Sequence, residues 1–307
     1  MGHAAISLTP AQALGIPIAL VGAVFLAIGS QLQQHGVAAV DSRSSAGPRV
    51  GLRVGELLAL ARRPSWLLGT LLLGLAIVFQ LFSLYLAPLT VVQPLGAVAL
   101  VITVLVNARV TKNRLDASAV RAVLLCVLGV GAFVGIAAVT TTTVPIQDTQ
   151  LVIVVAILTV VLAIFGIGFG VLRKSLPRLF YVVGAGMLFG FVATLAKVLI
   201  ARVQTILQTG FHLVFADWLT VVCLVGLLTA ALLGSYFVQT AYSTGSPSMV
   251  VAGLTVIDPM VGVTIGIVVL GEAADAPWWA AIVFALAGLV AVLGVYRLSR
   301  QSHGTRL

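Results

Sequence analysis

Asp258 is the residue of this chain whose type and position most clearly indicate chemistry. It lies about ten residues into the apolar stretch 248–270, or roughly 15 Å along a helix that rises 1.5 Å per residue. An ionised Asp near the middle of a bilayer costs roughly 2.5–3.5 kcal/mol on insertion scales, so it should face a cavity or a partner. We expect Asp258 to bind a cation or to take up a coupling proton. The alternative is a neutral side chain that is hydrogen-bonded to a neighbouring helix.

Uncharged polar side chains within apolar stretches form a second set of candidates, because they can hydrogen-bond a small solute. Gln80 and Gln239 occupy equivalent places in two apolar stretches, with Ser83 at i+3 from the first and Tyr236 at i−3 from the second. Each pair therefore shares a helix face. Hydrogen bonds between helices are the alternative role. The full set consists of Gln31, Gln80, Ser83, Gln93, Tyr236 and Gln239.

Lys197 lies near the end of the apolar stretch 179–200. It is roughly 27 Å along that helix, which places about 12 Å of depth between it and Asp258. A lysine stem hardly bridges that distance, so an ion pair with Asp258 is not expected. Solute binding and snorkelling to the nearby membrane interface remain as alternatives.

Prolines and glycines within the apolar stretches are expected to shape helices. Gly129 and Gly135 are expected to allow close helix packing, as small residues do in membranes. Four prolines are expected to bend or start helices and to act as structural hinges: Pro88, Pro94, Pro247 and Pro259.

Composition places these residues in a membrane protein. The chain has 307 residues, of which 61% are hydrophobic and only 8% charged, whereas soluble domains carry roughly 25% charged residues. About 20 apolar residues span a bilayer as a helix. Nine stretches qualify, at roughly 12–35, 65–86, 90–109, 118–139, 150–171, 179–200, 218–240, 248–270 and 278–296. Residues 201–217 could instead run along the membrane surface.

The charges indicate an orientation in the membrane. Basic residues concentrate in the linkers 36–64, 109–121 and 172–178 and in the C-terminal tail, which together hold 15 of the 17 Lys and Arg residues. With nine spans all four regions lie on one side, and an excess of Lys and Arg marks the cytoplasmic side. We therefore expect a protein of the cell membrane with its N-terminus outside and its C-terminus in the cytoplasm. The net charge of +9 then reflects orientation and not binding of nucleic acid.

An internal repeat relates the two parts of the chain. Gln80, Pro88 and Val91-Val92 return 159 positions later as Gln239, Pro247 and Val250-Val251. Because an odd number of spans separates the copies, they are inserted upside down relative to each other. We expect two halves of one membrane domain: residues 1–140 with helices 1–4, and residues 141–307 with a linking helix 5 followed by helices 6–9. Such inverted repeats are typical of secondary transporters.

Four motifs resemble the drug/metabolite transporter superfamily, in particular its EamA-like and NIPA-like branch. They are APLTVVQPLGA at 87–97, KNRL at 112–115, the glycine-rich run 184–197 ending in Lys197, and the run 258–272 from Asp258-Pro259 to Gly271-Glu272. In the second motif, Asn113 stands at the position where the family has an acidic residue. The resemblance covers most of the chain and implies a carrier that moves small solutes by alternating access. NIPA-like members are associated with Mg²⁺ transport.

The combined expectation is a secondary transporter of a small solute, coupled to protons or cations and lined by the residues named above. A NIPA-like Mg²⁺ transporter, with Asp258 as the metal ligand, is one alternative, and a scaffold or sensor without transport activity is another. No motif of an enzyme or of a nucleotide-binding loop occurs, so neither an enzymatic activity nor a cofactor is expected. The expected partners are the solute or cation and the lipid bilayer. A homodimer is left open.

Overall fold

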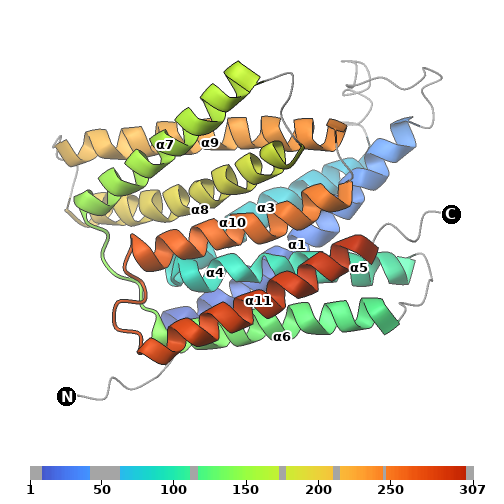
Figure 1. Cartoon of the computed structure of the whole chain (residues 1–307), viewed down its shortest axis with the longest axis horizontal. Helices are drawn as coiled ribbons and strands as arrows, with labels where there is room; N and C mark the ends of the chain where they lie inside the picture. The colour runs from blue at the N-terminus through green and yellow to red at the C-terminus, as the bar shows by residue number, and fades with distance from the viewer. Residues whose placement is uncertain are drawn as a thin grey trace.

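All regular secondary structure in the described residues of this computed structural model is helical. The described residues are 9–41, 63–110, 117–172, 178–209, 215–244 and 247–301. Figure 1 shows helices that lie side by side in a bundle. They are α1 (Pro10–Asp41), α3 (Pro64–Leu86), α4 (Leu89–Leu95), α5 (Ala97–Val110), α6 (Ala117–Thr140), α7 (Asp148–Leu172), α8 (Arg178–Thr209), α9 (Phe215–Thr244), α10 (Pro247–Val268) and α11 (Trp278–Gln301).

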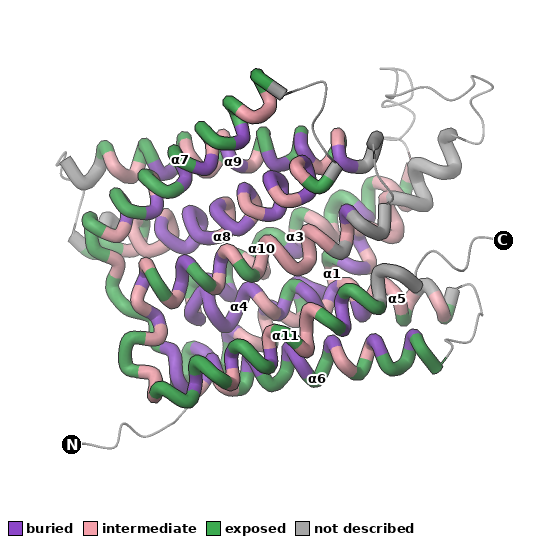
Figure 2. Tube along the Cα trace, in the orientation of Figure 1, coloured by how far each residue is buried: buried purple, intermediate pink, exposed green. Residues whose placement is uncertain are grey.

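Length and composition make this bundle a multi-pass membrane protein, which confirms the predicted class. Eight helices in the described part of the chain are long and apolar enough to cross a bilayer, with α4 and α5 counted as one span. The ninth predicted span falls on α10, whose apolar stretch Gly253–Val268 is shorter. Large apolar side chains also cover the outside of the bundle, where Leu71, Leu128 and Ile167 are each at least 60% exposed. Figure 2 shows such exposed positions along the outer edges of α6, α7 and α9.

The two ends of the bundle differ in their connections. One end, here called the break end, carries the interruption between α3 and α4 at Ala87–Pro88, together with residues 141–147 and 269–277. It lies on the left of Figure 1. The opposite end, here called the linker end, carries the helix ends that flank the basic linkers. Residues 42–62, 111–116 and 173–177 of those linkers lie outside the described residues, as does the KNRL motif at 112–115.

α8 contradicts the expectation of a surface segment at 201–217 over most of that range. The helix continues without interruption to Thr209, well past the predicted end at residue 200. Residues 201–209 therefore extend a membrane helix toward the break end. Residues 210–214 lie outside the described part of the chain.

Glycines bring α1 and α3 into close contact along their length. Gly15, Gly22 and Gly29 recur every seven residues on α1 and all face α3. A Cβ added at Gly29 would lie 3.0 Å from the carbonyl oxygen of Gly69, and one at Gly69 would lie 2.7 Å from the backbone nitrogen of Gln33. Small residues at such crossings let two backbones approach without a bulky side chain between them.

A second close crossing joins α6 and α11. A Cβ added at Gly129 would lie 2.4 Å from the backbone nitrogen of Ala291, and one at Gly294 would lie 2.4 Å from that of Cys126. The prediction that Gly129 mediates close packing is therefore confirmed. The same prediction for Gly135 is wrong, because a Cβ there would meet nothing within 4 Å.

The four predicted prolines occupy two kinds of position. Pro88 is the N-cap of α4 and Pro247 is the first residue of α10. Proline suits the start of a helix, since its missing N–H would have no partner there. Pro94 and Pro259 lie inside α4 and α10. Pro94 comes two residues before Gly96, where α4 gives way to α5.

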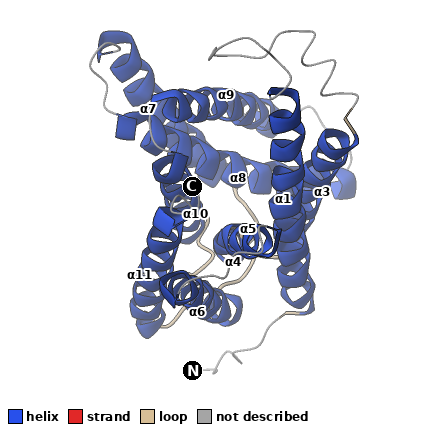
Figure 3. Ribbon diagram, turned by 90° about the vertical axis from the view of Figure 1, so that its right-hand side faces the viewer, coloured by secondary structure: helices blue, strands red, loops and turns tan. Residues whose placement is uncertain are grey.

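α4 and α5 occupy the middle of the bundle. Figure 3, which looks along the helices, shows α5 between α1 on one side and the pair α6 and α11 on the other. α4 contacts α1, α6, α8 and α10. Six of its seven residues are buried, including Thr90 and Gln93. A polar side chain on α4 is therefore held between several helices and away from lipid.

Candidate functional site

Three buried polar atoms have no hydrogen-bond partner among the described residues: Nε2 of Gln93, Nε of Arg202 and Oδ1 of Asp258. Buried polar groups nearly always find a partner, so each exception calls for an explanation such as a bound ion, water or ligand. Two of the three atoms, on Gln93 and Asp258, belong to neighbouring helices in the middle of the bundle. Sequence reasoning selected both of these residues as candidates.

α10 positions Asp258 against α8. A Cβ added at Gly190 of α8 would lie 2.9 Å from the carbonyl oxygen of Asp258, and one at Gly186 would lie 2.7 Å from Cβ of Ile257. The glycine-rich run of α8 thus allows the two backbones to touch at this residue. Asp258 is half-buried as a whole, although its Oδ1 atom is fully buried.

α4 positions Gln93 against the same part of α10. Gln93 is buried, and a Cβ added at Gly262 would lie 2.5 Å from its Nε2 atom. Gly262 is one helical turn from Asp258 and on the same face of α10. The Gln93 amide therefore packs against α10 about one helical turn along the chain from Asp258. Because both Nε2 and Oδ1 lack partners, these two atoms do not bond to each other.

An apolar cavity lies nearby, although neither Gln93 nor Asp258 lines it. It has a volume of about 90 Å³ and lies between α4, α5, α6, α10 and α11, with Pro94, Thr255 and Pro259 among its lining residues. A water molecule takes up about 30 Å³ in the liquid. The cavity is therefore too small for a larger solute in this conformation, and its almost entirely apolar lining offers little to hold an ion or water.

Lys197 acts at the break end and not at the membrane interface. The side chain is 4% exposed, and its Nζ donates to the carbonyl oxygens of Leu84 at 2.5 Å and Ala87 at 2.7 Å. These carbonyls belong to the last turn of α3 and its C-cap, where backbone acceptors lack helical partners and a positive charge is favourable. Lys197 therefore caps α3 from α8, and the snorkelling alternative is wrong.

Glu272 caps the other side of the same interruption. Its carboxylate accepts hydrogen bonds from the backbone nitrogens of Leu89 and Thr90 at 2.7 and 2.8 Å and from the Thr90 hydroxyl at 2.6 Å. Gly266 of α10 makes room for this contact, since a Cβ there would lie 2.8 Å from Oε2 of Glu272. Gly271 has a φ of 72°, a conformation that favours glycine, and precedes Glu272 directly.

Further hydrogen bonds tie the break end together. The amide of Gln12 donates to the carbonyl oxygen of Thr141 at 2.8 Å, and the backbone nitrogen of Thr142 donates to that of Glu272 at 2.9 Å. Gln150 donates to the carbonyl of Leu270. α1, α7 and the two connecting segments are thus joined by polar contacts at the end of the bundle where α3 stops.

The other residues predicted to bind solute lie on helices other than those of Asp258 and Gln93. Ser83 is fully buried and donates its hydroxyl to the carbonyl oxygen of Gly15 at 2.8 Å, which is a contact between α3 and α1. Gln31 and Gln80 are half-buried on the same pair of helices. Gln239 is exposed on α9.

Tyr236, one turn before Gln239 on α9, is 46% exposed. Its ring packs edge-on against Phe169 of α7, with 5.9 Å between ring centroids. The structure thus packs Gln93 against α10, the helix that carries Asp258, and places Tyr236 against an aromatic cluster.

Sequence reasoning missed two charged residues that the structure makes prominent. Glu272 was noted only as part of a motif, and no local signal links it to α4, whose start it caps from 183 positions away. Arg202 was not singled out at all. The sequence did offer one indication of its importance. Lys197 and Arg202 are the two basic residues of the chain that lie outside the basic linkers and tail.

The comparisons with known proteins leave the family open. The chain is 26% identical over 290 residues to an uncharacterised protein of Corynebacterium glutamicum, covering 94% of this chain and 96% of that protein. No protein-family model and no solved structure matches the chain. The similarity thus extends over nearly the full length of both chains.

Proposed function

We propose that the chain is a secondary carrier, of the type found in the drug/metabolite transporter superfamily, that moves a small solute across the cytoplasmic membrane by alternating access. The observation that carries this proposal is the pair of buried, unpartnered atoms on Asp258 and Gln93. A carboxylate inside a membrane bundle is costly, and such residues commonly mark ion or solute pathways. Asp258 takes up the proton or cation, and Gln93 offers an amide to the solute.

The helix boundaries support an inverted repeat of residues 1–140 and 141–307. α3 ends at Leu86 and α9 at Thr244, and each is followed by a proline that starts the next helix. A shift of 159 positions carries α6 (117–140) onto 276–299, within two residues of α11 (278–301). α3 and α9 run in opposite directions through the bundle (Figure 1). In carriers built this way the solute site lies between the two halves, near the bilayer midplane.

The polar contacts at the break end support a state that is closed on that side. The positive-inside rule places the linker end, with the C-terminus, in the cytoplasm and the break end outside. The capped interruption between α3 and α4 then forms part of an outer closure. Transport requires these contacts to rearrange when the halves rock, and the capping pair Lys197 and Glu272 stabilises the closed state.

Mg²⁺ is the alternative cargo. The described residues contain no group of three or more His, Cys, Asp or Glu side chains that could hold a metal. Mg²⁺ would therefore depend on Asp258, the Gln93 carbonyl oxygen and retained water, and Mg²⁺ does commonly bind through one or two carboxylates with several waters. The same experiment tests both cargoes.

Uptake into proteoliposomes tests the proposal. Purified protein is reconstituted, a pH gradient or membrane potential is imposed, and flux is followed for Mg²⁺ with an entrapped dye and for a panel of solutes. We expect a solute-dependent proton flux that falls at least about tenfold in Asp258→Asn, because the variant cannot exchange the proton. Asp275→Asn is the matched control, since this carboxylate is exposed in a connecting segment.

The outcomes separate the alternatives. Mg²⁺ entry that is lost in Asp258→Asn and kept in Asp275→Asn establishes the Mg²⁺ carrier. Flux of a solute that is equal in wild type and Asp258→Asn refutes the role of Asp258. Absence of flux across the whole panel, with normally folded protein, contradicts the carrier and favours a scaffold or sensor.

A further inference from the structure

A polar pocket separate from the Asp258 site lies at the break end. It has a volume of about 290 Å³ and lies between the last turn of α3, residues 143–146 and the second half of α8. This volume is just below the range typical of ligand sites, roughly 300–1,000 Å³. Polar side chains line it on the α8 side, at Lys197, Arg202, Gln204 and Gln208.

The charge of this lining is of one sign. Lys197 and Arg202 both contribute to it, and no lining residue is acidic. These are the two basic residues that the sequence places outside the basic linkers and tail. Lys and Arg are depleted on the non-cytoplasmic side of membrane proteins. Two of them in a single pocket at that end therefore need a specific reason.

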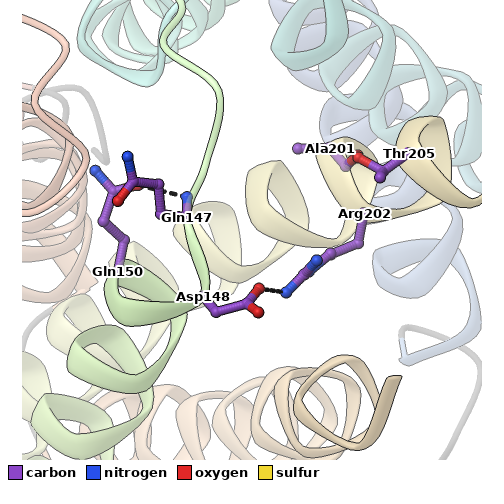
Figure 4. A network of polar contacts seen from close by, with 6 residues as sticks. All are labelled: Gln147, Asp148, Gln150, Ala201, Arg202 and Thr205. Carbon is purple, nitrogen blue, oxygen red and sulfur yellow. Dashed lines mark hydrogen bonds and ion pairs between the residues drawn. The ribbon is translucent and has the colours of Figure 1, made fainter. Parts of the chain in front are cut away.

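Arg202 has unused hydrogen-bonding capacity. Its side chain is 15% exposed and pairs through Nη2 with Asp148, the first residue of α7 (Figure 4). Its Nε atom is buried and has no partner. A guanidinium presents five N–H donors in a planar fork that matches the two oxygens of a carboxylate or phosphate. Asp148 is more than half exposed, so its charge is partly satisfied by water.

Lys197, also on α8, supplies a second donor to the pocket. Its Nζ uses two of three hydrogens on the carbonyls of Leu84 and Ala87, which leaves a third for the pocket. In addition, the carboxamides of Gln204 and Gln208 follow Arg202 along α8. The arrangement provides converging donors without a competing carboxylate on the pocket wall.

We propose that this pocket binds an oxyanion, namely the carboxylate or phosphate group of a small solute or of a lipid headgroup. The anion binds to the Arg202 guanidinium, beside its ion pair with Asp148, and accepts the third hydrogen of Lys197. This assignment does not depend on Asp258 or on transport.

Binding measurements on the purified full-length protein test the site. Inorganic phosphate and succinate are titrated in detergent by calorimetry, with sodium chloride of equal ionic strength and glycerol as references. We expect phosphate or succinate to bind wild type and Arg202→Gln to raise the Kd about 10- to 100-fold, the effect of losing a charge-assisted hydrogen bond. Arg202→Lys keeps the charge and the pairing with Asp148 but removes the fork, and it should also weaken binding. Arg297→Gln, an exposed residue of α11, is the matched control.

The two sources of the anion are distinguished in nanodiscs. Stabilisation by phosphatidic acid over phosphatidylcholine, lost in Arg202→Lys and without binding of free phosphate or succinate, identifies a lipid headgroup. Binding of the free anions identifies a soluble ligand. The proposal is overturned if wild type responds to neither, if glycerol binds equally well, or if the affinity of Arg202→Lys equals that of wild type.

Discussion

Replacing Glu272 by Ala should destabilise the protein more than most single substitutions. Glu272 is 3% exposed and accepts three hydrogen bonds of 2.6–2.8 Å at the start of α4. Pro88, the N-cap of α4, makes no side-chain capping bond, so Glu272 supplies the capping from 183 positions away. Its removal leaves two backbone N–H groups and a hydroxyl buried without an acceptor.

The magnitude follows from these contacts. A hydrogen bond to a charged group contributes about 1.5–3 kcal/mol, but three bonds to one carboxylate share a single desolvation cost. Leaving a buried donor without an acceptor costs about 1–3 kcal/mol, so with three donors affected we expect a loss of about 3–5 kcal/mol in the free energy of unfolding for Glu272→Ala. Glu272→Gln keeps one acceptor oxygen but turns an NH₂ group toward a donor. We therefore expect this variant to lose about half as much free energy of unfolding as Glu272→Ala.

Unfolding by SDS in mixed micelles, followed by circular dichroism, measures these differences. Asp275→Asn serves as the control, because its exposed carboxylate lies three positions away in the same segment. A surface change of this kind should stay within about 0.5 kcal/mol. A loss in Glu272→Ala no larger than that of the control would refute the capping role of Glu272.

Two further predictions concern helix contacts. Lys197→Met should lower the free energy of unfolding by about 2–4 kcal/mol, because two carbonyl acceptors at the end of α3 lose their donor. A double-mutant cycle that combines it with Glu272→Gln should show a coupling free energy above about 0.5 kcal/mol. Strictly additive losses would mean that the two caps act independently. Gly129→Ala should be destabilising, since its Cβ would lie 2.4 Å from the backbone of Ala291, whereas Gly135→Ala meets nothing within 4 Å and should be neutral or slightly stabilising. Thermal unfolding of both glycine variants checks this contrast, and equal melting temperatures would contradict it.

Local signals predicted the helices well. The interruption between α3 and α4 and the start of α10 were both predicted from Pro88 and Pro247, because proline restricts the backbone wherever it occurs. The apolar stretches coincide with helices, since a segment in lipid must satisfy its backbone hydrogen bonds internally. Asp258 was likewise selected by a local property, a charge in the middle of an apolar stretch.

Helix faces could not be predicted in the same way. In a soluble helix, polar residues mark the outer face, but here both the core and the lipid-facing surface are apolar. Gly129 and Gly135 look equivalent in the sequence, yet one lies at a helix crossing and the other meets no neighbour. Gln239 matches Gln80 in the repeat and is nevertheless exposed on α9.

By itself, then, the sequence determined that this is an all-helical membrane protein, where most of its helices lie along the chain, and that Asp258 falls well inside one of them. Only the tertiary structure decided that Gln93 packs against the helix that carries Asp258 and that Arg202 lines a pocket. It also decided that Lys197 and Glu272 cap the ends of α3 and α4, across 110 and 183 positions of sequence. The reason is physical: a donor and an acceptor so far apart in sequence meet only when helix packing brings them together, and helix packing depends on contacts that no single segment contains.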